Sequence, residues 1–196
     1  MWAVLSDVHG NLEALERALA TCRALGASRF AFLGDLLGRG DSDGCVRLIR
    51  AVAAVSVQGN RDRDWAPRVS APARAYVLAL PVVACADGFA CAHGDPRLHR
   101  PLDVSDIRRG ALRTYSWLRS QGLRLGFYGH THQARVWRKR GPNAPLEDVT
   151  AAAVPLDDDE QTIYLANVGT VGLPFPGKGP PSCTLYDGQR LRLVQL

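Results

Sequence analysis

The stretch that decides the fold is Trp2-Ala3-Val4-Leu5-Ser6-Asp7-Val8-His9-Gly10-Asn11. Its first four residues form a short apolar run, polar residues and a glycine follow, and residues 12–25 carry apolar side chains at helical spacing. This order predicts a buried strand, a tight turn and an amphipathic helix that ends at Gly26. Asp7 and His9 stand where the predicted strand stops.

Asp7 and His9 have two interpretations. In extended backbone, alternate side chains lie on the same face, so the carboxylate and the imidazole converge on one point, as the ligands of a cation do. Alternatively, Asp7 or Asn11 caps the following helix and His9 is an ordinary turn residue. These six residues fit both interpretations, so the rest of the chain has to decide.

The chain length predicts a single domain, residues 1–196, because 196 residues can bury one substantial core but are too few for two ordinary domains. Hydrophobic residues make up 46% and charged residues 22%, and no apolar stretch is long enough to span a membrane. The first apolar run meets Asp7 too early to be a secretory signal, so we expect a cytoplasmic protein. The five cysteines lack any C-x-x-C spacing, which predicts buried thiols in a reducing compartment.

The formal net charge of +5 comes mainly from arginines that are scattered along the chain. A positive surface favours anionic substrates. Nucleic acid is a candidate partner without support, because the chain has neither a recognition motif nor aromatic residues interleaved with the arginines.

Polar residues follow four further predicted strands. The strand at 30–33 ends in Gly34-Asp35, the strand at 55–57 ends in Gly59-Asn60, an apolar strand runs into His93, and the strand at 125–128 runs into Gly129-His130-Thr131-His132. Predicted helices at 43–53 and 105–120 separate these strands. Strands that alternate with helices predict an α/β fold, in which ligands bind at the strand ends.

The other expected elements are less closely tied to the site. We predict a surface loop over the Arg- and Pro-rich residues 61–75, and a loop-dominated segment at 141–160. The remaining expected elements are a hairpin at Asp87-Gly88, strands at 134–139 and 163–166, and a final hairpin at Asp187-Gly188.

The residues at the strand ends offer two carboxylates, one amide and four imidazoles. They are Asp7, His9, Asp35, Asn60, His93, His130 and His132. Only His99 among the histidines lies outside this set. Oxygen and nitrogen donors without thiolates suit two divalent ions such as manganese, iron, cobalt, nickel or zinc.

The ordered series Asp7-x-His9, Gly34-Asp35, Gly59-Asn60, His93-Gly94 and Gly129-His130-Thr131-His132 resembles the calcineurin-like metallophosphoesterases. The segment Asn167-Val168-Gly169-Thr170-Val171-Gly172 resembles the Asn-Pro-Gly-Ser-Val-Gly segment of the small prokaryotic phosphodiesterase branch. The resemblance implies two mixed β-sheets that form a sandwich flanked by helices. It also implies a phosphoesterase that attacks small phosphate esters or nucleotides in line with a hydroxide held by two metal ions.

Carried over position by position, the resemblance assigns Asp7, His9 and His132 to the first ion. It assigns Asn60, His93 and His130 to the second ion, with Asp35 bridging the two. Asp35 and Asn60 would then take part in catalysis. Two such ions leave the site positive, which suits an anionic phosphate.

Three positions depart from the family's patterns. Arg61 replaces the histidine of Gly-Asn-His-Asp, Gly38 replaces the second acid of the protein phosphatases' Gly-Asp-x-Val-Asp-Arg-Gly, and Val168 replaces a proline. Arg61 stays charged near neutral pH, so we expect it to bind phosphoryl oxygens in catalysis instead of donating a proton, which favours diesters. The alternative is that Arg61 points into solvent.

Arg39 is either a second phosphate ligand or an exposed turn residue. Two other functions also stay open. The same fold can serve as a non-catalytic protein-interaction scaffold, and a nuclease would bind DNA or RNA with strong salt dependence.

Overall fold

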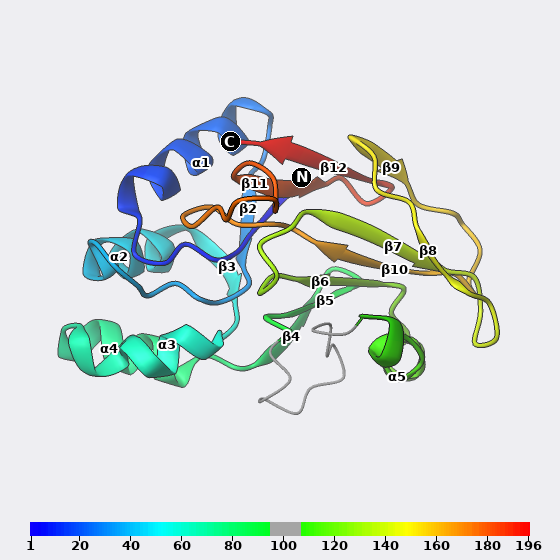
Figure 1. Ribbon diagram of the computed structural model, residues 1–196, viewed down its shortest axis with the longest axis horizontal. Coiled ribbons are helices and arrows are strands. Elements are labelled where there is room, and N and C mark those ends of the chain that lie inside the picture. The colour runs from blue at the N-terminus through cyan, green and yellow to red at the C-terminus, as the bar shows by residue number, and fades with distance from the viewer. Residues whose placement is uncertain (95–106) are drawn as a thin grey trace.

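Strand β1 (Trp2–Leu5) is buried on both faces because it lies inside one of two sheets that pack against each other (Figure 1). Trp2 and Val4 contribute to the core between the sheets, while Ala3 and Leu5 contribute to the core beneath the outer helices. This alternation explains an uninterrupted apolar run. The computed structural model describes residues 1–94 and 107–196.

Each sheet has six strands and contains a set of three parallel strands. The first sheet has the order β3 (Ala53–Ser56), β2 (Arg29–Phe32), β1, β11 (Ser182–Tyr186), β12 (Arg190–Gln195) and β9 (Ala153–Pro155). The second has the order β4 (Val83–Ala86), β5 (Phe89–Ala92), β6 (Leu125–Tyr128), β10 (Ile163–Asn167), β7 (Arg135–Lys139) and β8 (Leu146–Asp148). Strands β1, β2 and β3 are parallel to one another, as are β5, β6 and β10.

Helices cover the outer faces of both sheets. Helices α1 (Leu12–Ala24), α2 (Ser42–Val52) and α4 (Ala71–Ala79) share a core with β1 and β2. Helix α5 (Ile107–Ser120) shares a core with β5 and β10 on the second sheet. The layers therefore run helix, sheet, sheet, helix, which confirms the predicted α/β sandwich of two mixed sheets.

The predicted surface loop at 61–75 is wrong. Helix α3 (Asn60–Trp65), a short 3-10 helix (Ala66–Arg68) and the start of α4 occupy this segment. Its prolines stand in the first turns of the 3-10 helix and of α4, where a missing N–H costs no hydrogen bond. Ser70 caps α4 by accepting a hydrogen bond from Ala73 N–H.

Most of the other predicted elements are confirmed, including the hairpins at Asp87-Gly88 and Asp187-Gly188. Asp87 and Gly88 both have positive φ angles, 40° and 82°, which a tight two-residue turn requires. The segment at 141–160 contains two short strands, β8 and β9. Four of the five cysteines are buried, and Cys85 is exposed. Among the described residues, no helix is long and apolar enough to cross a membrane.

Candidate metal centre

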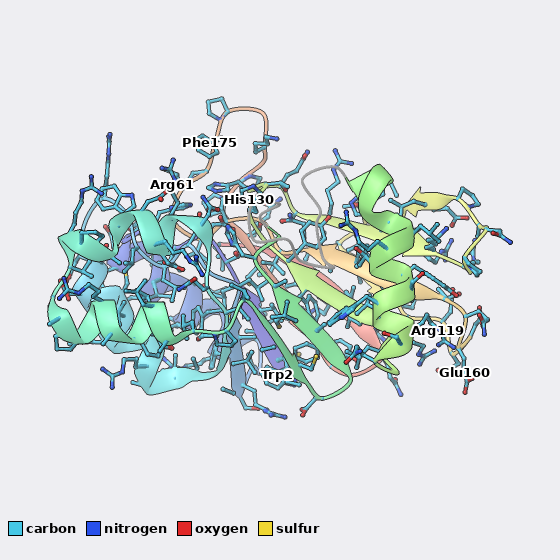
Figure 2. All side chains as sticks on the ribbon, turned by 90° about the horizontal axis from the view of Figure 1, so that it is seen from below. Trp2, Arg61, Arg119, His130, Glu160 and Phe175 are labelled. Atoms are coloured by element: carbon cyan, nitrogen blue, oxygen red, sulfur yellow. The ribbon has the colours of Figure 1, made fainter. Side chains whose placement is uncertain are left out.

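The seven candidate ligands lie at or just beyond the carboxyl ends of β1, β2, β3, β5 and β6. His99 and the rest of residues 95–106 lie outside the described part of the chain. Figure 2 shows His130, Arg61 and Phe175 gathered at one edge of the molecule, far from Trp2 at the opposite edge. The parallel strands thus bring residues from separate parts of the sequence to one place.

Five of these seven residues have left-handed backbone, which L-amino acids other than Asn and Asp rarely adopt. Their φ angles are 57° at Asp7, 52° at His9, 52° at Asp35, 67° at His130 and 59° at His132. Asp7 and His9 do converge, as predicted, with Asp7 Oδ1 3.6 Å from His9 Nε2. The expected cause, alternation along extended backbone, is wrong, because both residues have left-handed backbone. Asn11 caps α1, as the alternative interpretation expected, by accepting a hydrogen bond from Ala14 N–H.

The first group of ligand atoms comes from Asp7, His9 and His132, all buried. Asp7 Oδ1 lies 3.0 Å from His132 Nε2 and 3.6 Å from His9 Nε2. The two Nε2 atoms lie 3.2 Å apart. Three potential ligand atoms therefore face one point.

Asp35 joins this group to a second one. Its Oδ2 lies 3.9 Å from His9 Nε2, and its Oδ1 lies 3.4 Å from His93 Nε2. His93 Nε2 in turn lies 3.3 Å from His130 Nδ1. Asn60 and His130 are half-buried, and both line the cavity that contains Asp35.

The donor set fits divalent cations. Asp7 Oδ1 is buried and has no hydrogen-bond partner among the described residues. His93 Nδ1 lies 2.7 Å from Leu33 O, and His132 Nδ1 lies 2.6 Å from Leu173 O. Because a carbonyl oxygen only accepts, each Nδ1 carries a proton, and each Nε2 is the nitrogen that binds a metal ion once it has no proton of its own.

The charges of these groups are strongly linked. Burial alone would raise the pKa of Asp7, but the His93, His132 and His9 imidazoles together hold that pKa well below its usual range. Burial alone would lower the pKa of His93, but the Asp35 and Asp7 carboxylates raise it to about 10. The pKa of His132 is also raised, because the contacts with Asp7 outweigh burial. In the metal-free protein His93 is therefore protonated on both ring nitrogens at neutral pH. A cation that binds Nε2 displaces the proton there.

Asp62 supports the centre without being one of the predicted ligands. Its buried carboxylate accepts four backbone hydrogen bonds, from Asp35, Leu36, Leu37 and Gly59 N–H, at 2.8 to 3.0 Å. Burial and the charge of Asp35 raise the pKa of Asp62 to about 7, while the four donors favour its ionised form. Asp62 thus fixes the backbone that carries Asp35. In the sequence, only its place in Gly59-Asn60-Arg61-Asp62, two residues after a candidate ligand, indicates that Asp62 belongs to the site.

Asn167 fixes the loop of His130 and His132. Its Nδ2 donates to Gly129 O (2.6 Å) and to Thr131 Oγ1 (2.8 Å), and its Oδ1 accepts from Gly169 N–H. The same segment reaches Asp7, because Thr170 Oγ1 and Gly172 N–H both donate to Asp7 O. The sequence alone predicts no structural role for Asn167, Thr170 or Gly172.

Gly38 lies directly against His9. A Cβ atom added at Gly38 would lie 2.4 Å from His9 O, which is closer than real atoms approach. An acid at this position therefore cannot fit beside the present His9 backbone.

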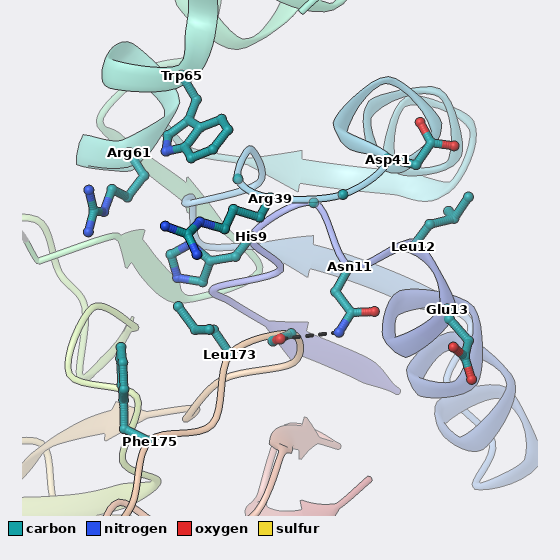
Figure 3. A pocket seen from close by; sticks show the side chains of 14 residues that line it. His9, Asn11, Leu12, Glu13, Arg39, Asp41, Arg61, Trp65, Leu173 and Phe175 are labelled. Carbon is teal, nitrogen blue, oxygen red and sulfur yellow. Dashed lines mark hydrogen bonds between the residues drawn. The ribbon is translucent and has the colours of Figure 1, made fainter. Parts of the chain in front are cut away.

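Arg39 and Arg61 lie at the rim of a pocket of about 620 Å³ that His9 also lines (Figure 3). Arg61 additionally lines the cavity of about 390 Å³ around Asp35 and the histidines. Both arginines are exposed. Neither guanidinium group forms a hydrogen bond or ion pair with residues 1–94 or 107–196.

The sequence and the fold are similar to those of known proteins. Residues 1–190 match the model of the calcineurin-like phosphoesterase superfamily domain. An uncharacterized protein, MJ0912, from Methanocaldococcus jannaschii is 44% identical over 63 residues, which cover 32% of this chain and only 26% of that protein. The match therefore spans about a quarter of the curated relative's length.

Solved structures share the fold along the whole chain. A metallophosphoesterase from Sphaerobacter thermophilus is 25% identical with a TM-score of 0.81, covering 100% of this chain and 87% of that one. An archaeal phosphodiesterase is 15% identical (TM-score 0.59; 100% and 99% covered). Vps29 from Entamoeba histolytica in complex with Zn²⁺ is 15% identical (TM-score 0.52; 98% and 97% covered). The last two show a common fold alone.

The two-sheet sandwich and the loops rich in histidine and aspartate define a metallophosphoesterase-like protein. The chain belongs to the calcineurin-like phosphoesterase superfamily. The clustered carboxylate and imidazole atoms are groups that could hold a metal ion.

We expect Asp62→Asn to destabilise the protein by about 2–4 kcal/mol, because an amide leaves some of the four buried N–H groups without an acceptor. We also expect metal affinity to fall roughly 10–100-fold, because Asp35 loses its fixed position. Urea denaturation and calorimetric metal titration measure these effects. The matched control is Asp158→Asn, at an exposed loop position. Equal metal affinity in Asp62→Asn and the control would contradict this role of Asp62.

We expect Mn²⁺ binding to chelator-treated protein to release at least about one proton near pH 7.5, because His93 is protonated until the metal ion displaces its proton. Apparent metal affinity should therefore rise as pH approaches about 10, the pKa of His93. The raised pKa stabilises the metal-free protein below the ordinary histidine value, and this contribution is lost as pH rises through about 10. Calorimetry in two buffers with different ionisation enthalpies measures the release. Identical heats in both buffers would contradict it.

Proposed function

We propose that the chain is a binuclear metal-dependent phosphoesterase that hydrolyses small phosphate esters or nucleotides and prefers diesters. The position of the Asp35 carboxylate supports this proposal most directly. One of its oxygens faces His93 and the other faces His9, as a bridge between two cations requires. Asp7, His9 and His132 would hold the first ion, and Asn60, His93 and His130 would hold the second.

Two bound ions, of manganese, iron, nickel or zinc, would activate water for in-line attack on phosphorus and offset the phosphate charge. The side chains and backbone of the protein position the reacting groups and the metal ligands. Asp35 and Asn60 orient the reacting groups, and Arg61 N–H holds Asp35 Oδ1 at 2.8 Å. The carbonyl oxygens beside His93 and His132 keep both imidazoles in one tautomer.

Arg61 and Arg39 are the proposed phosphate-binding residues. Both side chains stand beside the candidate ligand cluster without a carboxylate partner among the described residues. A guanidinium group donates two parallel hydrogen bonds to phosphoryl oxygens, but does not donate its proton near neutral pH. A monoester with a poor leaving group needs that proton more than a diester with a good one does.

The scaffold and the nuclease are less well supported. A scaffold has no need of seven convergent ligand residues, and buried polar groups without a cation would be costly. A nuclease would need a surface that tracks the nucleic-acid backbone, and the sequence carries no nucleic-acid recognition motif.

A metal and substrate panel tests the proposed function. We expect chelator-treated protein to be inactive towards bis(p-nitrophenyl) phosphate and to recover activity with manganese, iron, nickel or zinc. We expect Asp35→Asn to lower kcat by roughly 100-fold or more, since both ions lose a ligand, while Asp158→Asn keeps wild-type activity. Elemental analysis that finds no bound transition metal after supplementation would contradict the proposal.

Arg61→His tests the basis of the diester preference. We expect the wild-type enzyme to favour diesters over alkyl monoesters, and Arg61→His to raise relative monoester activity roughly tenfold, because histidine can donate a proton to the leaving group. The kcat/KM ratio for the two substrate classes measures this effect. Arg74→His, at an exposed position on α4, is the matched control. An unchanged ratio in Arg61→His would exclude a role for Arg61 in leaving-group preference.

A further inference from the structure

The pocket of about 620 Å³ adjoins the candidate metal centre directly. It shares His9, Arg61, Leu173 and Phe175 with the cavity of about 390 Å³ that contains the metal-ligand side chains. A molecule held by its phosphate at the metal centre would therefore extend into this pocket. The volume is typical of a site for a small molecule.

Aromatic and apolar side chains from two distant segments line this pocket. Trp65 ends helix α3, while Leu173 and Phe175 belong to the loop that follows β10. Figure 3 shows Trp65 on one side and Phe175 on the other, with the guanidinium groups of Arg39 and Arg61 between these two sides. Phe175 and Leu173 are 47% and 38% exposed, although both are large and apolar.

Phe175 also connects the pocket with the metal centre. Its ring lies against the imidazole of His132, with a distance of 4.8 Å between the ring centroids and an angle of 39° between the planes. A flat group that occupied the pocket would therefore lie beside a proposed metal ligand.

The charges of the pocket favour an anionic ligand. The acidic residues of its wall already have partners, since Glu13 pairs with Arg17 and Asp41 caps α2. The guanidinium groups of Arg39 and Arg61 have no such partner among the described residues. Guanidinium planes stack on aromatic rings as well as binding phosphate.

We propose that this pocket binds a planar aromatic ring in the alcohol part of the phosphate ester, so that Trp65 and Phe175 determine substrate specificity. The substrate class is a nucleoside phosphate ester or a simpler aryl phosphate ester, which share the ring and the attached phosphate. This inference rests on the proposed function, because the phosphate has to lie at the metal centre. Aliphatic phosphate esters fill the pocket poorly and bind more weakly.

The test compares pairs of ligands that differ in the ring. Calorimetry on the Mn²⁺-loaded protein measures the Kd of adenosine 5′-monophosphate against ribose 5-phosphate, and of phenyl phosphate against methyl phosphate. We expect the ring to tighten binding about tenfold in at least one pair, as stacking on aromatic side chains does. A gain in both pairs identifies a simple aryl ring as sufficient, and a gain in the first pair alone identifies a nucleoside.

Two variants assign the gain to the pocket. Phe175→Leu and Trp65→Leu should each lower the ratio to less than about threefold, because leucine offers no ring to stack on. The control is Leu78→Ala on α4, which removes a 50% exposed apolar side chain outside the pocket and should keep the wild-type ratio. Phe175 lies on an exposed loop, so its variant tests the inference even if Trp65→Leu fails to fold.

Turnover of bis(p-nitrophenyl) phosphate by the same preparation separates this inference from the proposed function. If the enzyme is active but the Kd values of the ligands with and without the ring differ by less than about threefold, the aromatic pocket is contradicted and the proposed function is not. A tenfold ratio that persists in both variants would also overturn it. A tenfold ratio that the variants abolish, in a protein that turns over no ester, would support the pocket and overturn the proposed hydrolysis.

Discussion

The candidate metal centre depends on left-handed backbone at five of its seven ligand residues. Such backbone costs non-glycine residues on the order of 1–3 kcal/mol each, so it persists only where the surroundings impose it. Here the ligand loops impose it on one another. Asp7 N–H donates to Gly34 O, His9 N–H donates to Asp35 O, and the Asp62 carboxylate holds the backbone from Asp35 onward. These turns, and not alternation along a strand, therefore direct the ligand side chains towards one another.

The second constraint is the fixed spacing of the two sheets. Asp7 and Asp35 follow strands of the first sheet, while His93 and His130 follow strands of the second. His93 Nδ1 donates to Leu33 O, and His130 N–H donates to Asp7 Oδ2, so hydrogen bonds join the two sets of loops. Beneath them, Phe89 makes edge-to-face contacts with Trp2 of the first sheet and with Phe127 of the adjacent strand β6. The separation of the ligand groups therefore follows from the packing of apolar side chains far from any metal.

The sequence predicts those features that depend on local pattern. Apolar runs that end in polar residues predict the strand ends, and Asp87-Gly88 predicts a tight hairpin, because each signal lies within a few residues. The Arg- and Pro-rich composition of residues 61–75 predicts a loop, yet proline also fits the first turn of a helix, and helices form there. The sequence predicts no role for Asp62 and Asn167, because most of their hydrogen-bond partners lie in other loops, which no local pattern reveals. The pocket between Trp65 and Phe175 needs α3 and the loop after β10 to meet, so it too appears only in the folded chain.

The three departures from the family's patterns differ in physical meaning. Gly38 fits its surroundings, because any Cβ atom there would collide with the His9 backbone. Val168 donates its N–H to Tyr128 O, a hydrogen bond that proline lacks, and so adds to the attachment of β10 to β6. Arg61 differs from both, since its backbone N–H holds Asp35 while its side chain contacts no hydrogen-bond partner among the described residues. The Arg61 side chain lines the cavity around Asp35, where a substrate of the proposed function would lie. The departure at Arg61 therefore bears on the proposed substrate binding, whereas the departures at Gly38 and Val168 bear on the backbone.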